Sequence, residues 1–109
     1  MDKLIKVINE FRDDRDWRQF HTPKDLALSI SLEASELLEN FQWKDSKEAI
    51  KENRENIQDE IADVLMYLMM LSDDLDIDLY DAITKKIEKN KLKYPVDKSK
   101  GNNKKYTDF

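Results

Sequence analysis

Four acidic residues at helical spacing carry the strongest chemical signal in this sequence. One pair is Glu33 and Glu36, and the second pair is Glu60 and Asp63. A spacing of three residues places both acids of a pair on the same face of an α-helix. The residues beside each pair are apolar, so each pair interrupts a surface that its helix would otherwise bury. We call these four residues the acid quartet.

The acid quartet is costly to bury unless its charge is compensated. Like charges one helical turn apart repel, and a buried carboxylate without a partner either destabilises the fold or takes up a proton. A divalent cation relieves both penalties, and oxygen ligands of this kind favour Mg²⁺, with Mn²⁺ as a second candidate. The pattern alone leaves two interpretations open, a metal site and a set of ordinary exposed acids, because the chain contains 24 acidic residues.

Polar residues extend each acid pair along the same helix face. Ser29 and Asn40 do so around the first pair, and Asn56 and Tyr67 do so around the second. We interpret Ser29 and Asn56 as parts of a solvated face.

Several other classes of site and location are excluded or disfavoured by composition. A ferritin-type di-iron site needs a Glu-x-x-His motif on each of two helices, and the one histidine, His21, lies outside both acid pairs. The chain has no cysteine, which excludes disulfides, Cys-zinc sites and thiol catalysis. A formal net charge of −5 argues against binding to a nucleic acid polymer. No apolar run approaches the roughly 20 residues that cross a bilayer, and no signal peptide is evident, so we expect no membrane partner and a cytoplasmic protein.

The elements that must position the acid quartet are helical, and we expect an all-α fold. Thr22 before Pro23 is typical of a helix start, Ser46 is the expected N-cap of the next helix, and Pro95 ends the last one. Apolar spacing predicts helices over about residues 2–14, 23–41, 46–72 and 78–94. We expect one helical domain over residues 1–95, followed by a polar, lysine-rich tail over residues 96–109 that would be disordered alone.

The second predicted helix is apolar around most of its circumference. Such a helix is expected to lie deep in a bundle or in an oligomer. A single copy of so short a chain cannot easily cover these faces. We therefore predict a four-helix bundle-type protomer that assembles into a homodimer or homotetramer.

Short segments spread along the chain resemble one family of nucleotide hydrolases. The 23 residues between Glu36 and Glu60 complete a four-acid pattern that is similar to the signature of the MazG-like, all-α NTP pyrophosphohydrolases. The local match is closer to the dCTP pyrophosphatase branch of that family. The segments that carry it are RDWRQFHTP at residues 15–23, FQWK at 41–44, EIADVLMY at 60–67, KYP at 93–95 and KKYT at 104–107.

The resemblance implies an activity and a role for the acid quartet. Members of the family use Mg²⁺ to cleave an NTP between the α- and β-phosphates, giving NMP and pyrophosphate. Carried over, Glu33, Glu36, Glu60 and Asp63 would be both the metal ligands and the catalytic residues, and one of them would orient or deprotonate the attacking water. The implied substrate is dCTP or a related or modified pyrimidine dNTP, and the implied role is nucleotide-pool housekeeping.

The resemblance also implies a set of substrate-binding residues. Trp17 and Trp43 would line the base pocket, and the alternative is that both pack in the core or in an oligomer interface. His21 either contacts the nucleotide or packs at the helix start. Tyr67 either bonds to the sugar or a phosphate or packs in the core. Four further residues would reach substrate from the C-terminal part of the chain: Asn90, Lys93, Lys105 and Tyr106.

A competing hypothesis is a non-enzymatic helical module for oligomerisation or partner binding. The wide apolar faces of the second and third helices would then serve association alone.

Overall fold

A computed structural model describes all of residues 1–109, and the chain is helical throughout, with no strand. The all-α class predicted from the sequence is therefore confirmed. The chain divides into two compact units, Met1–Asp76 and Ile77–Phe109, which are described one at a time. The chain lacks any helix with the length and apolar character needed to span a bilayer.

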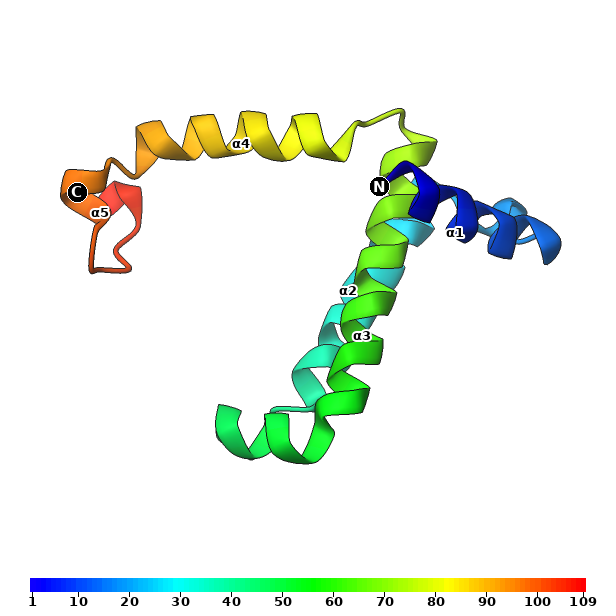
Figure 1. The fold of residues 1–109 in the computed structure, drawn as a ribbon, viewed down its shortest axis with the longest axis horizontal. Helices are drawn as coiled ribbons and strands as arrows, with labels where there is room; N and C mark the ends of the chain where they lie inside the picture. Colours follow the sequence, from blue (N-terminus) through cyan, green and yellow to red (C-terminus); the bar gives the residue numbers. More distant parts are fainter. The chain divides into compact units, whose positions relative to one another are not determined.

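The first unit is built on two helices that lie side by side. It contains α1 (Asp2–Asp14), a short 3₁₀ helix η1 (Arg18–Phe20), α2 (Pro23–Glu39) and α3 (Ser46–Asp74). Figure 1 shows α2 and α3 packed along each other, and α1 crossing the C-terminal half of α3. The turn between α2 and α3 returns the chain, so the two acid pairs face each other.

Side-chain caps explain where the helices begin. Thr22 caps α2 as predicted, because its Oγ1 accepts a hydrogen bond of 3.2 Å from the backbone N–H of Asp25. The cap of α3 is Asp45, and the prediction of Ser46 was wrong by one residue. The Asp45 carboxylate accepts from the backbone N–H of Glu48 at 2.8 Å, and its negative charge suits the positive end of the helix dipole.

The first unit buries few apolar side chains. Three polar residues are also buried, namely Arg12, Asn40 and Ser72. By contrast, large apolar side chains of α2 such as Leu28, Leu32 and Leu38 are exposed by more than half. The buried apolar residues are Ile8, Leu26, Ala49, Met69 and Met70.

The second unit consists of α4 (Leu79–Lys93), α5 (Val96–Ser99) and a 3₁₀ turn η2 (Tyr106–Asp108). Asp78 caps α4, accepting from the backbone N–H of Asp81 at 2.9 Å. The tail expected to be disordered alone carries α5 and η2 and folds back onto the end of α4. The ring of Tyr94 meets Tyr106 and Phe109 edge to face, with ring centroids 5.9 Å apart in each pair. The predicted domain boundary at residue 95 stays a prediction.

Candidate active site

Three members of the acid quartet converge between α2 and α3. Glu33 and Glu36 project from α2 and Glu60 from α3, and each offers a carboxylate oxygen within 4.8 Å of those of the other two. Asp63 lies one turn further along α3, where its charge acts on Glu33 and Glu60. The three-residue spacing within each pair and the side-by-side packing of the two helices together produce this convergence.

Two carboxylate oxygens in this cluster are buried without a partner. Oε2 of Glu33 and Oε2 of Glu60 accept no hydrogen bond. Burial, followed by the neighbouring carboxylates of Glu36 and Glu60, raises the pKa of Glu33 from 4.5 to about 7. Burial is also the main cause that raises the pKa of Glu60. The protein therefore holds acceptor oxygens in a place where their negative charge is disfavoured.

The donor set of this cluster fits a hard divalent cation. Several carboxylates present oxygens to one point, and the unpaired oxygens of Glu33 and Glu60 lack any protein donor that would occupy them. Oxygen-only ligand sets suit Mg²⁺ and Mn²⁺, and bound cations offset the repulsion between the acids. The cluster is a possible metal site.

The raised pKa of Glu33 predicts how pH acts on the metal-free protein. Because the folded state holds this proton more tightly than the unfolded chain does, the contribution of Glu33 to stability is greatest below about pH 4.5 and is lost as the pH rises through 7. Glu33→Gln should remove this loss. With EDTA present, the Tm of the variant minus that of the wild type should increase from pH 5 to pH 8. A difference that stays constant over this range would contradict the burial of an ionisable Glu33.

An aromatic pocket of about 180 Å³ adjoins the acid quartet at Asp63. The rings on its wall meet edge to face in sequence: Trp17 and His21 have centroids 6.3 Å apart, and those of His21 and Tyr67 are 6.4 Å apart. The structure thus gathers three of the residues nominated for substrate binding beside one of the nominated metal ligands. The lining residues are Phe11, Trp17, His21, Asp63, Met66, Tyr67 and Met70.

His21 and Tyr67 carry polar atoms in this pocket that can form hydrogen bonds. Nδ1 of His21 is buried without a partner. Burial, and after it the positive charge of Arg12, lowers the pKa of His21, so its ring is neutral at physiological pH. Burial, and after it the charge of Glu33, raises the pKa of Tyr67, so its hydroxyl keeps its proton and can donate.

Trp43 does not line this pocket. Trp43 is 92% exposed and takes a positive φ of 64° in the turn after α2. Residues of the second unit have their own cluster, in which Nζ of Lys93 lies 5.0 Å from the centroid of the Tyr106 ring. The part played at the site by Trp43 and by four residues of the second unit stays a prediction: Asn90, Lys93, Lys105 and Tyr106.

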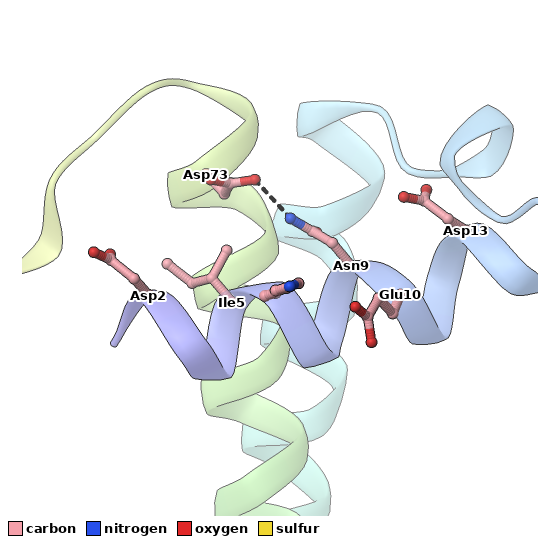
Figure 2. Close-up of a pocket in the computed structure, with 7 residues that line it drawn as sticks. Asp2, Ile5, Asn9, Glu10, Asp13 and Asp73 are labelled. Carbon is pink, nitrogen blue, oxygen red and sulfur yellow. Dashed lines mark hydrogen bonds between the residues drawn. The ribbon is translucent and has the colours of Figure 1, made fainter.

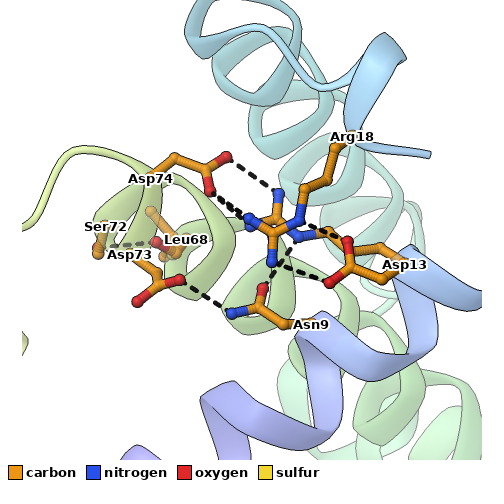
Figure 3. Close-up of polar contacts among 8 residues, drawn as sticks. Asn9, Asp13, Arg18, Leu68, Ser72, Asp73 and Asp74 are labelled. Atoms are coloured by element: carbon orange, nitrogen blue, oxygen red, sulfur yellow. Dashed lines mark hydrogen bonds and ion pairs between the residues drawn. The ribbon is translucent and has the colours of Figure 1, made fainter. Parts of the chain in front are cut away.

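A buried ion pair that the sequence patterns did not reveal supports the pocket. The guanidinium of Arg12 is fully enclosed and donates two hydrogen bonds to Asp74 and one of 2.9 Å to Oδ1 of Asn9. Figure 3 shows these two partners, Asp74 and Asn9. The backbone carbonyl of Arg12 accepts from the N–H of Trp17 at 2.9 Å. The pair therefore ties the corner that carries Trp17 to the last turn of α3. The spacing of four residues from buried Ile8 is the one sequence signal that could have revealed Arg12.

A second bond from Asn9 strengthens this junction. Its Nδ2 donates to Oδ2 of Asp73 at 2.9 Å, and Figure 2 shows this bond at the rim of a hollow of about 460 Å³ along α1. The hollow is lined mainly by charged side chains and contains no member of the acid quartet.

Most of the chain matches one known protein family. The sequence model of the MazG-like family matches residues 28–109. The chain belongs to the MazG-like family. The resemblance predicted from the motifs is thereby confirmed.

Individual relatives extend the match to the whole of this MazG-like chain. It is 41% identical to dCTP pyrophosphatase 1 of Mus musculus over 114 aligned residues, which cover 100% of this chain and 67% of the mouse protein. The identity to dCTP pyrophosphatase 1 of Homo sapiens is 38%, with the same coverage. A crystal structure of a pyrophosphatase from Archaeoglobus fulgidus superimposes with a TM-score of 0.83 at 46% identity, covering 87% of this chain and 92% of that one.

Proposed function

We propose that this protein is a nucleoside triphosphate pyrophosphatase that hydrolyses a dNTP to the monophosphate and pyrophosphate. The observation that carries the proposal is the convergence of Glu33, Glu36 and Glu60, with two buried and unpaired oxygens, beside an aromatic pocket. The names of relatives in mouse, human and Archaeoglobus fulgidus support the same class of enzyme.

The proposed chemistry divides between a cation and the carboxylates that would hold it. Mg²⁺ bound by the acid quartet would neutralise charge on the phosphates and lower the pKa of a bound water. A carboxylate of the quartet accepts the proton that the attacking water loses. The water oxygen bonds to the α-phosphorus, the bond from that phosphorus to the bridging oxygen breaks, and pyrophosphate leaves.

The pocket beside Asp63 is the proposed site for the base and sugar. The ring of Trp17 offers a stacking surface, and base–aromatic stacking is worth about 1–3 kcal/mol per base. Neutral His21 and protonated Tyr67 add directional hydrogen bonds. We propose a pyrimidine dNTP, dCTP or a modified relative, as substrate. Lys93 and Lys105 would pair with phosphate oxygens, with Asn90, Tyr106 and Trp43 as further contacts.

Assembly into a homodimer or homotetramer is part of the proposal. Its support is the apolar surface of the first unit, including a groove of about 320 Å³ between α1 and α3 that is lined almost wholly by apolar atoms. Surfaces of this kind mark association sites. The four-helix bundle-type protomer and a cytoplasmic location stay predictions of the same account.

A substrate panel tests the reaction. The purified chain, incubated with Mg²⁺ and each of the common and modified dNTPs in turn, should release one pyrophosphate per monophosphate, fastest with a pyrimidine dNTP. Release of single orthophosphate would contradict cleavage between the α- and β-phosphates. If no dNTP is turned over, and if Mg²⁺ with a nucleotide leaves the Tm unchanged, a helical interaction module becomes the better interpretation.

A further inference from the structure

The acid quartet works only if α2 and α3 are held at a fixed separation where its side chains meet. Metal ligation tolerates errors of about 0.2 Å in ligand distance. Apolar side chains near the acids, such as Leu37, Ile57 and Val64, are only half-buried. No apolar side chain is fully buried over residues 27–48 or 50–68, and Asn40 is the one buried residue within those two stretches.

Asn40 joins the two helices through hydrogen bonds from two other asparagines. Nδ2 of Asn56 donates to Oδ1 of Asn40 at 2.7 Å, and Nδ2 of Asn53 donates to the backbone oxygen of Asn40 at 2.8 Å. The amide of Asn40 donates back to the carbonyls of Glu36 and Leu37, both at 3.3 Å. The hydrogen-bonding groups of Asn40 are therefore directed at both helices, which is more than a solvated polar face requires.

The Asn40–Asn56 bond lies at the same spacing from the acids on both helices. Asn40 follows Glu36 by four residues on one helix, and Asn56 precedes Glu60 by four residues on the other. Four residues of α-helix span about 6 Å, so the Asn40–Asn56 bond lies roughly one turn from the point where Glu36 meets Glu60. Between them lies only stiff, hydrogen-bonded helix. Asn53, the one residue of α3 with non-helical angles (φ −117°, ψ 18°), marks a kink at this point of the helix.

We propose that Asn56 is a positioning residue for the metal ligands, acting through its hydrogen bond to Asn40. The bond sets the distance between α2 and α3 at Glu36 and Glu60, and thereby the spacing of the oxygens that would hold the cation. Asn56 itself touches neither metal nor substrate. This inference rests on the proposed metal site.

The test is Asn56→Ala in the full chain, with Mn²⁺ as the probe. Asn56 is exposed, and alanine has a higher helix propensity than asparagine, which offsets part of the cost of leaving Oδ1 of Asn40 without its donor, so the variant should stay folded. Loss of one hydrogen bond should weaken Mn²⁺ binding by about 3- to 10-fold. Electron paramagnetic resonance of the free ion measures this binding. The Mg²⁺ concentration for half-maximal turnover should rise by the same factor. The kcat at saturating Mg²⁺ should stay within twofold of the wild type.

Two control variants separate positioning from stability. Gln58→Ala removes an amide from the same helix that makes no side-chain bond, and Ala49→Gly destabilises α3 at a fully buried position. Both should bind Mn²⁺ as the wild type does. An Asn56→Ala variant with unchanged affinity, or equal losses in Ala49→Gly, would overturn the positioning role. A wild-type protein that binds no Mn²⁺ would overturn the metal site as well as this inference.

Discussion

Glu36→Gln should reduce turnover by about 10²–10³-fold while the protein stays folded. The substitution preserves the size of the side chain but replaces a charged oxygen with an amide nitrogen, which cannot ligate a hard cation. Asp63→Asn should have a comparable effect, because the charge of Asp63 acts on the same cluster. The measurement is pyrophosphate release at saturating dNTP and Mg²⁺, with circular dichroism to confirm helix content.

The matched control for this loss is Glu39→Gln. Glu39 is exposed on the same helix, one turn beyond Glu36, and makes no side-chain hydrogen bond or ion pair. It should retain the wild-type rate. Either quartet variant turning over at the wild-type rate would show that its carboxylate is not a metal ligand.

Arg12→Met should produce the largest loss of stability. The guanidinium is 0% exposed, and its removal leaves the carboxylate of Asp74 and the amide oxygen of Asn9 without their donor. Breaking a fully buried ion pair costs about 3–5 kcal/mol. We expect a smaller value of about 2–3 kcal/mol, because the side chain of Asp74 is 22% exposed and Arg18 lies 3.6 Å away. The corresponding fall in Tm is about 10–20 °C.

Two further variants test the cause of that loss. Arg18→Ala removes an exposed ion pair with Asp13 and a longer contact with Asp74, and should lower the stability far less than Arg12→Met does. The double variant Arg12→Met/Asp74→Leu should recover much of the stability, because no charge is left uncompensated. Urea unfolding gives all the values. An Arg12→Met variant as stable as Arg18→Ala would contradict a structural role for the buried pair.

Local sequence patterns predicted the helices and the shared face of the two acids in each pair. Apolar periodicity and side-chain caps depend on neighbours three or four residues apart, so the cap at Thr22 could be assigned from the sequence alone. The predicted cap of α3 was wrong by one residue because Asp45 and Ser46 are adjacent and both are good capping residues.

Long-range polar contacts could not be predicted in the same way. Arg12 and its partner Asp74 are 62 residues apart in the sequence, and Asn40 and its partner Asn56 are 16 residues apart. Apart from the four-residue spacing between Ile8 and Arg12, nothing local distinguishes these side chains from the many polar residues that face water. The regular structure of the tail was not predicted for a related reason. It depends on contacts of Tyr106 and Phe109 with the ring of Tyr94, which the average composition of the tail does not reveal.

Anomalous diffraction from crystals grown with Mn²⁺ would show whether the acid quartet holds a cation. We expect a peak between α2 and α3, in contact with carboxylate oxygens of Glu33, Glu36 and Glu60, with Asp63 beside it. Crystals of Glu36→Gln grown in the same way should show a weaker peak or none. Full Mn²⁺ occupancy elsewhere on the molecule, with no peak at the acid quartet, would rule out the proposed metal site.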